Sequence, residues 1–566
     1  MGGVKGFTLV LGGEAGQGIQ FLEKALLHIV KESGLYVFAT KEYMSRVRGG
    51  INTTEIRISS EPVRAHVDVI DLLIPLKNGV IEHLGSRVTK STTIVGSREH
   101  IGGRDTEIDF AATAKKHGNQ LYTNSVALGF LCGLLDFDSA NLYKEIRDTF
   151  SLKSEGIIAG NIDAAEEGYK IGMASHSRLL TSGRPTPAKN RSLQENLLLN
   201  GADAVALGAM AGGCNAAFAY PMTPGTSVFL TLAEFSKQAD IVVEQVEDEI
   251  GVINMAIGSW YAGGRAIVST SGGGFALMTE GISLAGMTET PVVVHLAQRP
   301  GPATGLPTRT EQGDLNLVLY AGHGEFARLI LAPGTLEQAF EYTRLAFNLA
   351  DRFQIPVFVL TDQFFVDSYY PIAHPDAGQV QIESAVIKTD DSYKRYQLSE
   401  DGVSPRGIPG YGSGNVCLDS DEHDEDGKIT EDLDGIHLAM ADNRLKKLET
   451  LTKAAMLPEL VGEPDYATLI IGWGSTYGAI CEALQIIGSG KVSFLFCPQL
   501  YPLSEKIAEY IDGAQKVVVV ENNQLGQFAD FLQRELGRLF PHRILKYNGM
   551  PFSVEELVQS ITEEMI

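Results

Sequence analysis

Three consecutive acids, Glu247, Asp248 and Glu249, follow a predicted strand and open a predicted helix. Acids in the first turn of a helix complement its dipole, so their presence alone has a purely structural explanation. Glu249 differs from the other two because the almost wholly apolar run at 250–256 follows it. A carboxyl beside such a run is desolvated and can share a proton with a ligand nitrogen. Glu249 is therefore either a helix-dipole acid or a proton-sharing group.

Other polar and glycine-rich positions also follow predicted strands. Thr223 stands between two prolines, which stiffen the backbone and hold its hydroxyl where it can donate to a substrate carbonyl or carboxylate. The segment 271–274 and then Arg299 follow later strands. His295, near the end of its strand, is expected to be a satisfied core histidine. Ligands of parallel α/β sheets bind at the carboxyl ends of the strands, so the other residues are candidates for one site.

A glycine-rich turn near the N-terminus is a separate candidate. Gly13, Gly16 and Gly18 lie between a predicted strand and a predicted helix, in a spacing that matches neither the dinucleotide nor the P-loop pattern. Bare backbone amides at the start of a helix suit a phosphate-bearing ligand, and a tight structural turn is the equal alternative. Arg48 belongs to a nearby basic cluster that either holds phosphate or makes surface salt bridges.

Short apolar runs separated by helix-length segments predict the elements that position these residues. In the middle of the chain they are typical of a parallel sheet covered on both faces. The strands are predicted at 217–220, 241–244, 266–269, 292–296, 329–332 and 357–361, with 7–11 before them and 467–471, 492–497 and 516–520 after them. A helix is predicted from residue 19 to about residue 31. The fold class is therefore α/β, in three ordered regions.

These elements divide the 566 residues into five segments. We expect an α/β domain at 1–180, a linker at 181–196, a second α/β domain at 197–380, an irregular acidic connecting region at 381–462 and a last α/β domain at 463–566. Nine acids fall within 419–434, which predicts a solvated or partner-facing loop. A cation site is the lesser alternative there, because Leu433 stands where an EF-hand has its glutamate.

Composition and charge exclude several classes of protein. The 70 acidic residues exceed the 46 lysines and arginines, and no basic stripe offsets them, so a nucleic-acid or anionic-membrane partner is not expected. No apolar stretch is long enough for a signal peptide or a membrane span. The five cysteines include no Cys-x-x-Cys pair. We therefore expect buried, reduced thiols in a cytoplasmic protein, with no metal or iron–sulfur site built by this chain alone.

Six motifs in a fixed order give the candidate residues a common context. They are Tyr220-Pro221-Met222-Thr223-Pro224, Glu249-Ile250-Gly251, Thr270-Ser271-Gly272-Gly273-Gly274, His295-Leu296-Ala297-Gln298-Arg299, Gly305-Leu306-Pro307-Thr308 and Glu311-Gln312-Gly313-Asp314. Together they resemble the 2-oxoacid:ferredoxin oxidoreductase family in its fused gamma–alpha subunit form, over nearly the whole chain. The fused form and the acidic loop are most similar to the 2-oxoglutarate enzymes of that family.

The resemblance implies a gamma domain first, a thiamine-pyrimidine-binding domain of the thiamin-diphosphate-binding fold next, and a transketolase C-terminal-like domain last. It implies thiamine diphosphate as cofactor, with Glu249 hydrogen-bonded to the aminopyrimidine ring. Thr223 and Arg299 would hold the carboxylate and carbonyl oxygens of a 2-oxoacid. Further cofactor-binding positions implied are Tyr220, Pro221, Ser271 and Gly272 for thiamine diphosphate, and Gly13, Gly16, Gln17, Gly18 and Arg48 for coenzyme A.

The resemblance also implies partners. The chain has no convincing Gly-Asp-Gly…Asn motif for Mg²⁺ and diphosphate and no clustered cysteines for a [4Fe–4S] centre, and in the family both belong to the beta subunit. We expect a dimer of alpha–beta heterodimers, with ferredoxin as electron acceptor. The expected reaction converts 2-oxoglutarate, coenzyme A and oxidised ferredoxin to succinyl-CoA, CO₂ and reduced ferredoxin, reversibly. The alternatives are the same chemistry on pyruvate, branched-chain or aryl 2-oxoacids, and a non-catalytic coenzyme A- or nucleotide-binding protein.

Overall fold

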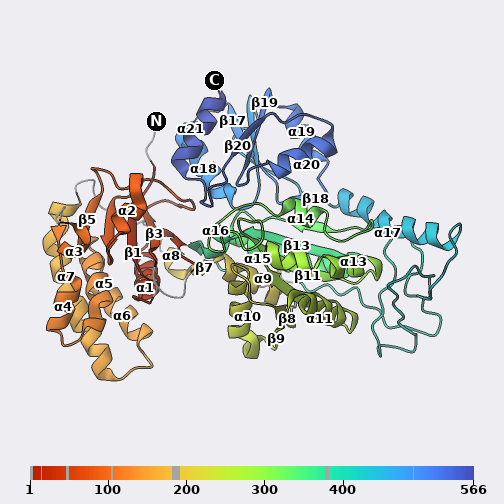
Figure 1. The fold of residues 1–566 in the computed structure, drawn as a ribbon, viewed down its shortest axis with the longest axis horizontal. Helices are drawn as coiled ribbons and strands as arrows, with labels where there is room; N and C mark the ends of the chain where they lie inside the picture. Colours follow the sequence, from red (N-terminus) through yellow and green to blue (C-terminus); the bar gives the residue numbers. More distant parts are fainter. Residues whose placement is uncertain are drawn as a thin grey trace. The chain divides into compact units, whose positions relative to one another are not determined.

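The chain forms two compact units, which are described separately (Figure 1). Unit 1 takes Met1–Leu199 together with the later segments Asp367–His374 and Ser553–Glu556, and unit 2 takes the rest. The domain limits expected from the sequence stay a prediction. This computed structural model describes residues 4–14, 16–45, 50–102, 106–180, 192–375, 381–488 and 490–565.

Unit 1 is built on a mixed sheet whose described strands run in the order β6-β5-β4-β1-β3-β2-β14-β7. The strand predicted at 7–11 is confirmed as β1 (Phe7–Gly13). It is antiparallel to β3 (Asn52–Ser59) and parallel to β4 (Leu72–Pro75). An unpredicted strand from far along the chain, β14, pairs with β2. The other strands are β2 (Tyr36–Glu42), β5 (Thr93–Gly96), β6 (Thr106–Glu107), β7 (Leu197–Asn200) and β14 (Tyr369–Ile372).

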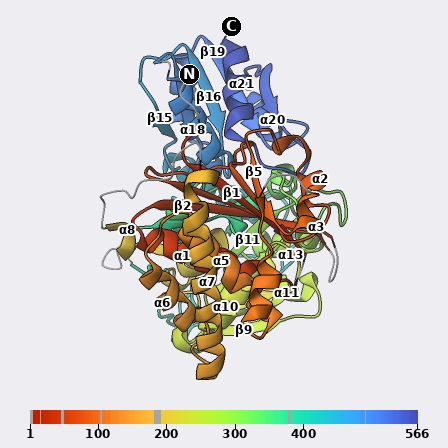
Figure 2. The same ribbon diagram turned by 90° about the vertical axis from the view of Figure 1, so that its left-hand side faces the viewer.

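Side chains of β1 divide between two cores, because successive residues of a strand face opposite sides of its sheet. Leu9 and Leu11 lie in a core with the helices α1, α5 and α7, which Figure 2 shows together beside the sheet. Val10 lies in a second core with α2 and α3. The helix predicted from residue 19 is confirmed as α1. The helices of unit 1 are α1 (Ile19–Glu32), α2 (Val80–Leu84), α3 (Arg98–Ile101), α4 (Phe110–Lys116), α5 (Thr123–Leu134), α6 (Ser139–Thr149), α7 (Glu155–Leu179) and α8 (Ser192–Glu195), with short 3-10 turns at Gly85–Arg87 and Gln120–Tyr122.

The main sheet of unit 2 has its described strands in the order β18-β12-β13-β11-β10-β8-β9. Its strand pairs are parallel except for the edge strand β18, which is antiparallel to β12. The predicted parallel sheet is confirmed, whereas β18 was not predicted. Its strands are β8 (Ala216–Ala219), β9 (Val242–Gln245), β10 (Ala266–Thr270), β11 (Val292–Gln298), β12 (Leu329–Leu331), β13 (Pro356–Asp362) and β18 (Gln499–Tyr501).

Helices cover this sheet on both faces, because β11 and β13 are buried along their whole length. α9 lies especially close to α15, since a β-carbon on Gly208 would stand 2.4 Å from the Phe340 carbonyl oxygen. The helices are α9 (Gly201–Ala211), α10 (Thr226–Ala239), α11 (Glu249–Tyr261), α12 (Gly272–Leu277), α13 (Thr279–Met287), α14 (Leu315–Leu319), α15 (Leu336–Phe353) and α16 (Gln363–Asp367).

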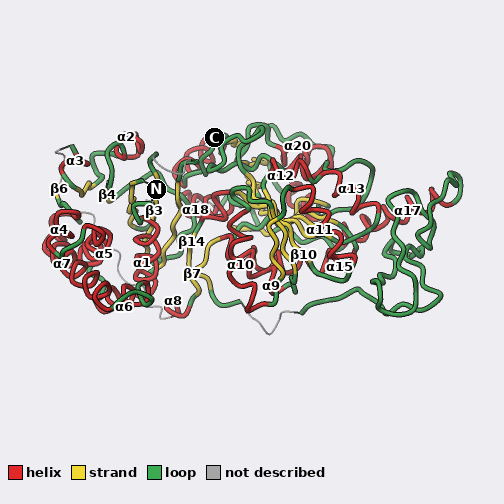
Figure 3. Tube along the Cα trace, turned by 60° about the horizontal axis from the view of Figure 1, so that its bottom comes forward, coloured by secondary structure: helices red, strands yellow, loops and turns green. Residues whose placement is uncertain are grey.

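The connecting region at 381–462 has few regular elements, as expected: Figure 3 shows mostly loop beside α17 (Ile436–Lys453). Its acidic segment is not wholly solvated, which corrects the expectation from composition. His423 is buried and its ring centroid lies 3.8 Å from that of Tyr396. Glu422 pairs with Arg444 at 3.0 Å. Aromatic packing and an ion pair therefore hold part of the segment against the protein.

The last region contains a second, smaller sheet of unit 2, in the order β15-β17-β16-β19-β20. Its three predicted strands are confirmed as β16, β17 and β19. The strands are β15 (Glu459–Val461), β16 (Thr468–Gly472), β17 (Val492–Phe496), β19 (Lys516–Glu521) and β20 (His542–Leu545), and the helices are α18 (Thr476–Ile487), α19 (Lys506–Asp512), α20 (Gln527–Leu536) and α21 (Val554–Met565).

The thiols differ from one another in exposure. Cys132, Cys214 and Cys497 are buried, but Cys417 is exposed, so the expectation of uniformly buried cysteines is wrong. Among the described residues, no helix is long and apolar enough to cross a membrane. Within the same residues, no three His, Cys, Asp or Glu side chains gather in a group that could hold a metal ion.

Candidate active site

Glu249 is the first residue of α11, just after the carboxyl end of β9. Asp248 caps this helix, because its Oδ1 accepts the N–H of Gly251 at 2.7 Å. Glu249 is only 3% exposed, whereas Glu244, Glu247 and Asp248 are exposed. Oε1 of Glu249 is buried and has no hydrogen-bond partner among the described residues. Such an oxygen costs free energy unless a ligand satisfies it, so Glu249 is the acid best placed to meet one.

A glycine, not the apolar run after Glu249, makes room for this carboxyl. A β-carbon on Gly274 would stand 2.6 Å from Oε1 of Glu249 and 2.4 Å from Oγ1 of Thr270. The run at 250–256 does not form one wall as predicted, because Ile250 and Met255 are 51% and 40% exposed. The desolvation of Glu249 therefore comes from its contact with the start of α12 as well as from its own helix.

The turn that leads into α12 carries two more candidates, Ser271 and Gly272. The Ser271 side chain is fully buried, and its Oγ has no partner within the described chain. A β-carbon on Gly272 would stand 2.4 and 2.5 Å from the two carboxyl oxygens of Asp314. Oδ2 of Asp314 is also buried without a partner there. Three buried oxygens without a partner among the described residues thus lie around one glycine-rich turn: Oε1 of Glu249, Oγ of Ser271 and Oδ2 of Asp314.

Arg299 and Thr223 meet at the same turn. Nη1 of Arg299 donates to the carbonyl oxygen of Thr223. Met222, next to Thr223, accepts the N–H of Gly274 at its sulfur, 3.1 Å away. Burial lowers the pKa of Arg299, and the charge of Asp314 opposes that shift. The structure therefore brings the predicted site residues of unit 2 together around the segment 271–274.

Asp314 lies against the same turn, although no role was predicted for its side chain. Burial is the main cause that raises its pKa to about 7, with help from the like charge of Glu311 and against the attraction of Arg299. Its backbone N–H donates to Oε1 of Gln298 at 3.0 Å, and Nε2 of Gln298 donates to the Thr361 carbonyl at 3.0 Å. These bonds fix Asp314 beside Arg299, a long-range arrangement that no local sequence pattern indicates.

The loop before Asp314 is held by the smaller sheet of unit 2. Nε2 of Gln312 donates to the Trp473 carbonyl at 2.8 Å. The N–H of Gln312 donates to the Asn522 carbonyl at 2.7 Å, and the N–H of Asn522 returns a bond to Oε1 of Gln312 at 2.9 Å. These bonds join residues that are far apart in sequence, so no local sequence pattern could predict them.

His295 is a satisfied core histidine, as predicted. It is fully buried, its Nδ1 lies 3.0 Å from the Ser269 hydroxyl, and its Nε2 lies 2.9 Å from the Thr361 hydroxyl. Burial lowers its pKa to about 3. A fully buried neutral ring with both nitrogens hydrogen-bonded is not placed to exchange a proton with a substrate.

Tyr220 and Pro221 lie beside this cluster, after β8, and both are exposed. Tyr220 is 39% exposed, and other large apolar side chains of unit 2 are similarly open, Leu277 at 52% and Leu306 at 50%. The unpartnered polar groups are thus accompanied by exposed apolar side chains on neighbouring segments.

The candidate turn of unit 1 closes on itself. Oε1 of Gln17 accepts the N–H of Glu14 at 2.7 Å, and a β-carbon on Gly13 would stand 2.5 Å from the same oxygen. Gly18 has a φ of +78°, and the amide of Asn124 donates to the Gln17 carbonyl at 2.7 Å. At Gly16, also at positive φ, a β-carbon would meet open space. Arg48 lies outside the described residues, and so does its neighbour Arg46.

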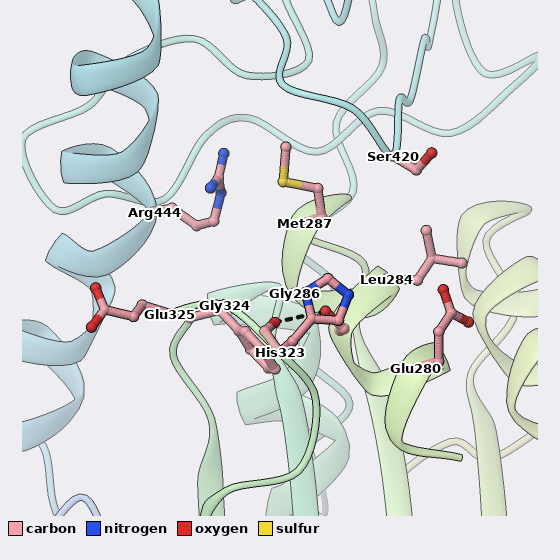
Figure 4. A pocket seen from close by; sticks show the side chains of 11 residues that line it. Glu280, Leu284, Gly286, Met287, His323, Gly324, Glu325, Ser420 and Arg444 are labelled. Atoms are coloured by element: carbon pink, nitrogen blue, oxygen red, sulfur yellow. Dashed lines mark hydrogen bonds between the residues drawn. The ribbon is translucent and has the colours of Figure 1, made fainter. Parts of the chain in front are cut away.

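A separate pocket of unit 2 holds none of the predicted site residues. It lies between α13, the loop that carries His323 and Glu325, and Arg444 of α17 (Figure 4). Ser283 of α13 donates to the His323 carbonyl at 2.8 Å across its wall. The charged side chains of this pocket do not point toward one common place (Figure 4). We therefore take the cluster around Glu249, and not this pocket, as the candidate active site.

The chain is similar to known proteins over most of its length. Residues 207–442 match the family described as pyruvate flavodoxin/ferredoxin oxidoreductase, thiamine diP-bdg, and residues 8–171 match pyruvate ferredoxin/flavodoxin oxidoreductase. The chain is 30% identical to a 2-oxoacid:ferredoxin oxidoreductase subunit alpha from Sulfolobus sp, across 98% of this chain and 96% of the relative. It is also 30% identical to the 2-oxoglutarate oxidoreductase subunit KorA of Mycobacterium tuberculosis, across 85% and 73% of the two chains.

A solved structure is similar over the same extent. It is the 2-oxoglutarate:ferredoxin oxidoreductase from Magnetococcus marinus with 2-oxoglutarate, coenzyme A and succinyl-CoA bound. The match has a TM-score of 0.91 at 30% identity and covers 99% of this chain and 100% of that chain. The predicted α/β fold with a thiamine-diphosphate-binding domain is thereby confirmed. The chain belongs to the 2-oxoacid:ferredoxin oxidoreductase family, oxidoreductases that use ferredoxin as acceptor.

Proposed function

We propose that this chain is the gamma–alpha subunit of an enzyme that converts 2-oxoglutarate, coenzyme A and oxidised ferredoxin to succinyl-CoA, CO₂ and reduced ferredoxin, reversibly. The observation that carries the proposal is the buried, unpartnered Oε1 of Glu249, in the part of the chain that matches a thiamine-diphosphate-binding family. A relative named for 2-oxoglutarate and a similar structure with 2-oxoglutarate bound support that substrate over other 2-oxoacids.

The residues around Glu249 fit thiamine diphosphate. An aminopyrimidine ring presents nitrogens that pair with a carboxyl, and Oε1 of Glu249 lacks a partner among the described residues. Ser271 adds a buried hydroxyl without a partner there, and Gly272 allows close backbone approach. When bound, thiamine diphosphate supplies the electron sink for decarboxylation. The part of Glu249 is to hold the proton that it shares with a ring nitrogen, in a site dry enough to keep that proton in place.

Arg299 and Thr223 suit the 2-oxoacid. Arg299 is 9% exposed and uses one N–H for the Thr223 carbonyl, so the rest of its planar fork can point at a carboxylate. Thr223 is half-buried, and its hydroxyl can donate to the ketone oxygen. Because its bond to the Thr223 carbonyl holds the Arg299 guanidinium in place, this group can orient the substrate before the reaction begins.

Coenzyme A is assigned to unit 1. The Gly13–Gly18 turn opens α1, and the open space at Gly16 leaves room for a phosphate against bare backbone amides. The side chain of Gln17 is used within the turn, so its contribution is to hold the loop shape. A similar structure with coenzyme A bound supports the assignment.

A beta subunit completes the enzyme. Polar atoms that lack partners among the described residues lie with the exposed apolar side chains of Tyr220, Leu277 and Leu306, a combination that a protein interface would cover. We assign Mg²⁺, the diphosphate contacts and the [4Fe–4S] centre to that subunit, ferredoxin to the role of electron acceptor, and the assembly to a dimer of alpha–beta heterodimers. Relatives named as alpha subunits support the existence of such a partner.

Co-expression with the chain encoded beside it tests the function. The purified complex is expected to reduce methyl viologen with 2-oxoglutarate only when coenzyme A is present, and more slowly with pyruvate, branched-chain or aryl 2-oxoacids. A faster rate with one of those acids would change the substrate and keep the chemistry. Coenzyme A binding without reduction by any 2-oxoacid would favour the non-catalytic alternative.

A further inference from the structure

The carboxyl of Asp314 occupies a place that only a glycine neighbour permits. Both of its oxygens lie against Gly272, where a β-carbon would stand 2.4 and 2.5 Å from them. Oδ2 is buried and receives no hydrogen bond from any described residue. The backbone around it is held, since its N–H donates to Gln298 at 3.0 Å and its carbonyl accepts the N–H of Val318 at 3.0 Å. The backbone that carries this carboxyl is therefore held in place, while Oδ2 has no partner among the described residues.

Few charged groups face this carboxyl. Arg299 attracts it from the end of β11, and Glu311 repels it from the same loop. Glu249 approaches the same turn at Gly274, two residues beyond Gly272. On the side of α20 the contact is neutral, because Nε2 of Gln527 donates to the Gly313 carbonyl at 2.8 Å. The acid beyond it, Glu521, is held by the backbone N–H groups of Phe528 and Ala529.

We propose that Asp314 is a positioning residue of the 2-oxoacid site: when ionised it competes with the substrate carboxylate for Arg299, and when the substrate binds it takes up a proton. The protonated carboxyl then donates a hydrogen bond from Oδ2 toward the bound anion. The proton comes from solvent, and no covalent bond of the substrate changes in this step. The inference rests on the proposed function, because it needs a substrate carboxylate at Arg299.

The sign of the coupling follows from the charges. In the free site the pKa of Asp314 is about 7, with burial as the largest cause. A substrate carboxylate beside Arg299 adds a second negative charge, which disfavours the ionised form and raises this pKa further. Substrate binding and proton binding therefore favour each other, and affinity for the 2-oxoacid falls as the pH rises above about 7.

The pH profile of KM tests this coupling on the assembled alpha–beta enzyme. For the parent, KM for 2-oxoglutarate is expected to be flat below pH about 7 and to rise by up to about tenfold per pH unit above it. Asp314→Asn keeps a hydrogen-bond donor and carries no charge at any pH. Its KM is expected to be independent of pH, and at pH 8 to lie about tenfold below that of the parent.

A second variant keeps Asp314 itself. Glu311→Gln removes the like charge that raises the pKa of Asp314, so the rise in KM is expected to begin at a lower pH than in the parent. A measurement without turnover uses N-oxalylglycine, an unreactive amide analogue of 2-oxoglutarate. Calorimetry in two buffers of different ionisation enthalpy at pH 8 should show proton uptake on binding to the parent, and none on binding to Asp314→Asn.

Two results would overturn the inference. One is an Asp314→Asn enzyme that keeps the pH dependence of the parent. The other is a KM raised by the same factor at every pH, which a merely structural role would give. Failure of the proposed function would give a different result. Arg299→Lys would then leave KM for the 2-oxoacid unchanged, which means that the substrate carboxylate does not bind at Arg299.

Discussion

Glu249 and Glu247 are two residues apart, yet only one of them is suited to chemistry. Asp248 uses its side chain to cap α11, and Glu247 remains exposed. Glu249 begins the helix with its side chain turned to the start of α12, where Gly274 leaves space for its carboxyl. Of the three acids, Asp248 thus caps the helix, Glu247 faces solvent and Glu249 is buried. The geometry of the backbone at the helix start determines these positions.

Glu249→Gln tests the buried acid. Glutamine keeps the size and the hydrogen-bonding capacity of the side chain but cannot exchange a proton. We expect assembly with the beta chain to survive and turnover to fall by roughly 10²–10⁴-fold, the usual span for a lost acid–base group. Exchange of the cofactor C2 proton for deuterium, followed by quenched NMR, should slow in the variant.

Glu247→Gln is the matched control for this change, because Glu247 is an exposed acid two residues away. Its turnover and C2 exchange should equal those of the parent. If Glu249→Gln exchanges as fast as the parent, Glu249 is a helix-dipole acid, and Glu244 or Glu247 becomes the candidate.

Arg299→Lys tests the carboxylate site. Lysine keeps the charge but loses the planar fork, of which one arm already donates to the Thr223 carbonyl. KM for the 2-oxoacid should rise and kcat/KM should fall roughly ten- to a hundredfold. Arg352→Lys, at an exposed position on α15, is expected to have no effect on either quantity. Unaltered kinetics in Arg299→Lys would place the carboxylate site elsewhere.

The sequence was informative about site residues whose signal is local. Thr223 between two prolines, Glu249 at a helix start and Arg299 after a strand were all indicated by residue type and position, and the structure brings them together. Asp314 stands in one of the six motifs, but its residue type and position indicated no role for its side chain. Its proposed role depends on contact with Gly272, which lies 42 residues earlier, and on the bond from its N–H to Gln298.

At the scale of the elements, the central strands were predictable because each is a short apolar run buried on both faces. β11 and β13 are of this kind, and both were placed within two residues of their bounds. Of the described strands, β2 to β7 and β14 of unit 1 and β15, β18 and β20 of unit 2 were missed. β14 and β18 show one reason for this. Each has only three or four residues and pairs with a strand far away in sequence, so its partner and not its own composition makes it a strand.

The irregular connecting region is fastened to α15 by buried charge. Asp351 accepts from Arg265 at 2.8 Å and from Arg406 of the connecting region, and the three side chains are at most 9% exposed. Burial lowers the pKa of both arginines, which the charge of Asp351 opposes. A region with few helices and strands can thus be held in place by a few buried ion pairs. Its polar composition alone did not predict these pairs.

Asp351→Asn tests this anchor. The change leaves two buried guanidinium groups without a counter-charge, which should lower the free energy of unfolding of unit 2 by about 3–5 kcal/mol. Urea denaturation followed by tryptophan fluorescence is a suitable measurement, because both tryptophans, Trp260 and Trp473, are buried in unit 2.

Glu509→Gln is the control for the anchor, since Glu509 pairs with Lys506 at 2.7 Å on an exposed surface. Exposed pairs of this kind contribute about 0–1 kcal/mol, so its unfolding curve should nearly overlie that of the parent. Equal stability of Asp351→Asn and the parent would mean that apolar contacts, not the ion pairs, hold the connecting region.

At the scale of the whole molecule, the chain is not a simple succession of domains. Unit 1 takes in Asp367–His374 and Ser553–Glu556, so a sheet that begins at Phe7 is completed by residues more than 350 positions later. A linear pass along the sequence finds changes of composition, such as the one that predicts a linker at 181–196, but cannot find a strand that returns to an earlier sheet. The organisation of the whole molecule was for this reason the least predictable level.

The cysteines of this chain are poorly suited to hold an iron–sulfur centre. An iron–sulfur centre needs several thiolates at one place, and thiolates need deprotonation. Burial raises the pKa of Cys214 and of Cys497 to about 12, and it also raises that of Cys132. Cys417 and Cys481, the remaining two, are 64 residues apart and too few for a cluster of their own.

This chain purified without its partner is therefore expected to be colourless and inactive, and to become brown and active only with a beta subunit. Absorbance near 400 nm, iron content and the electron paramagnetic resonance of the reduced protein measure the cluster, and methyl viologen reduction measures activity. A reducible iron–sulfur signal from this chain alone would show that its thiols bind a cluster despite their raised pKa. The assignment of the cluster to the beta subunit would then be wrong.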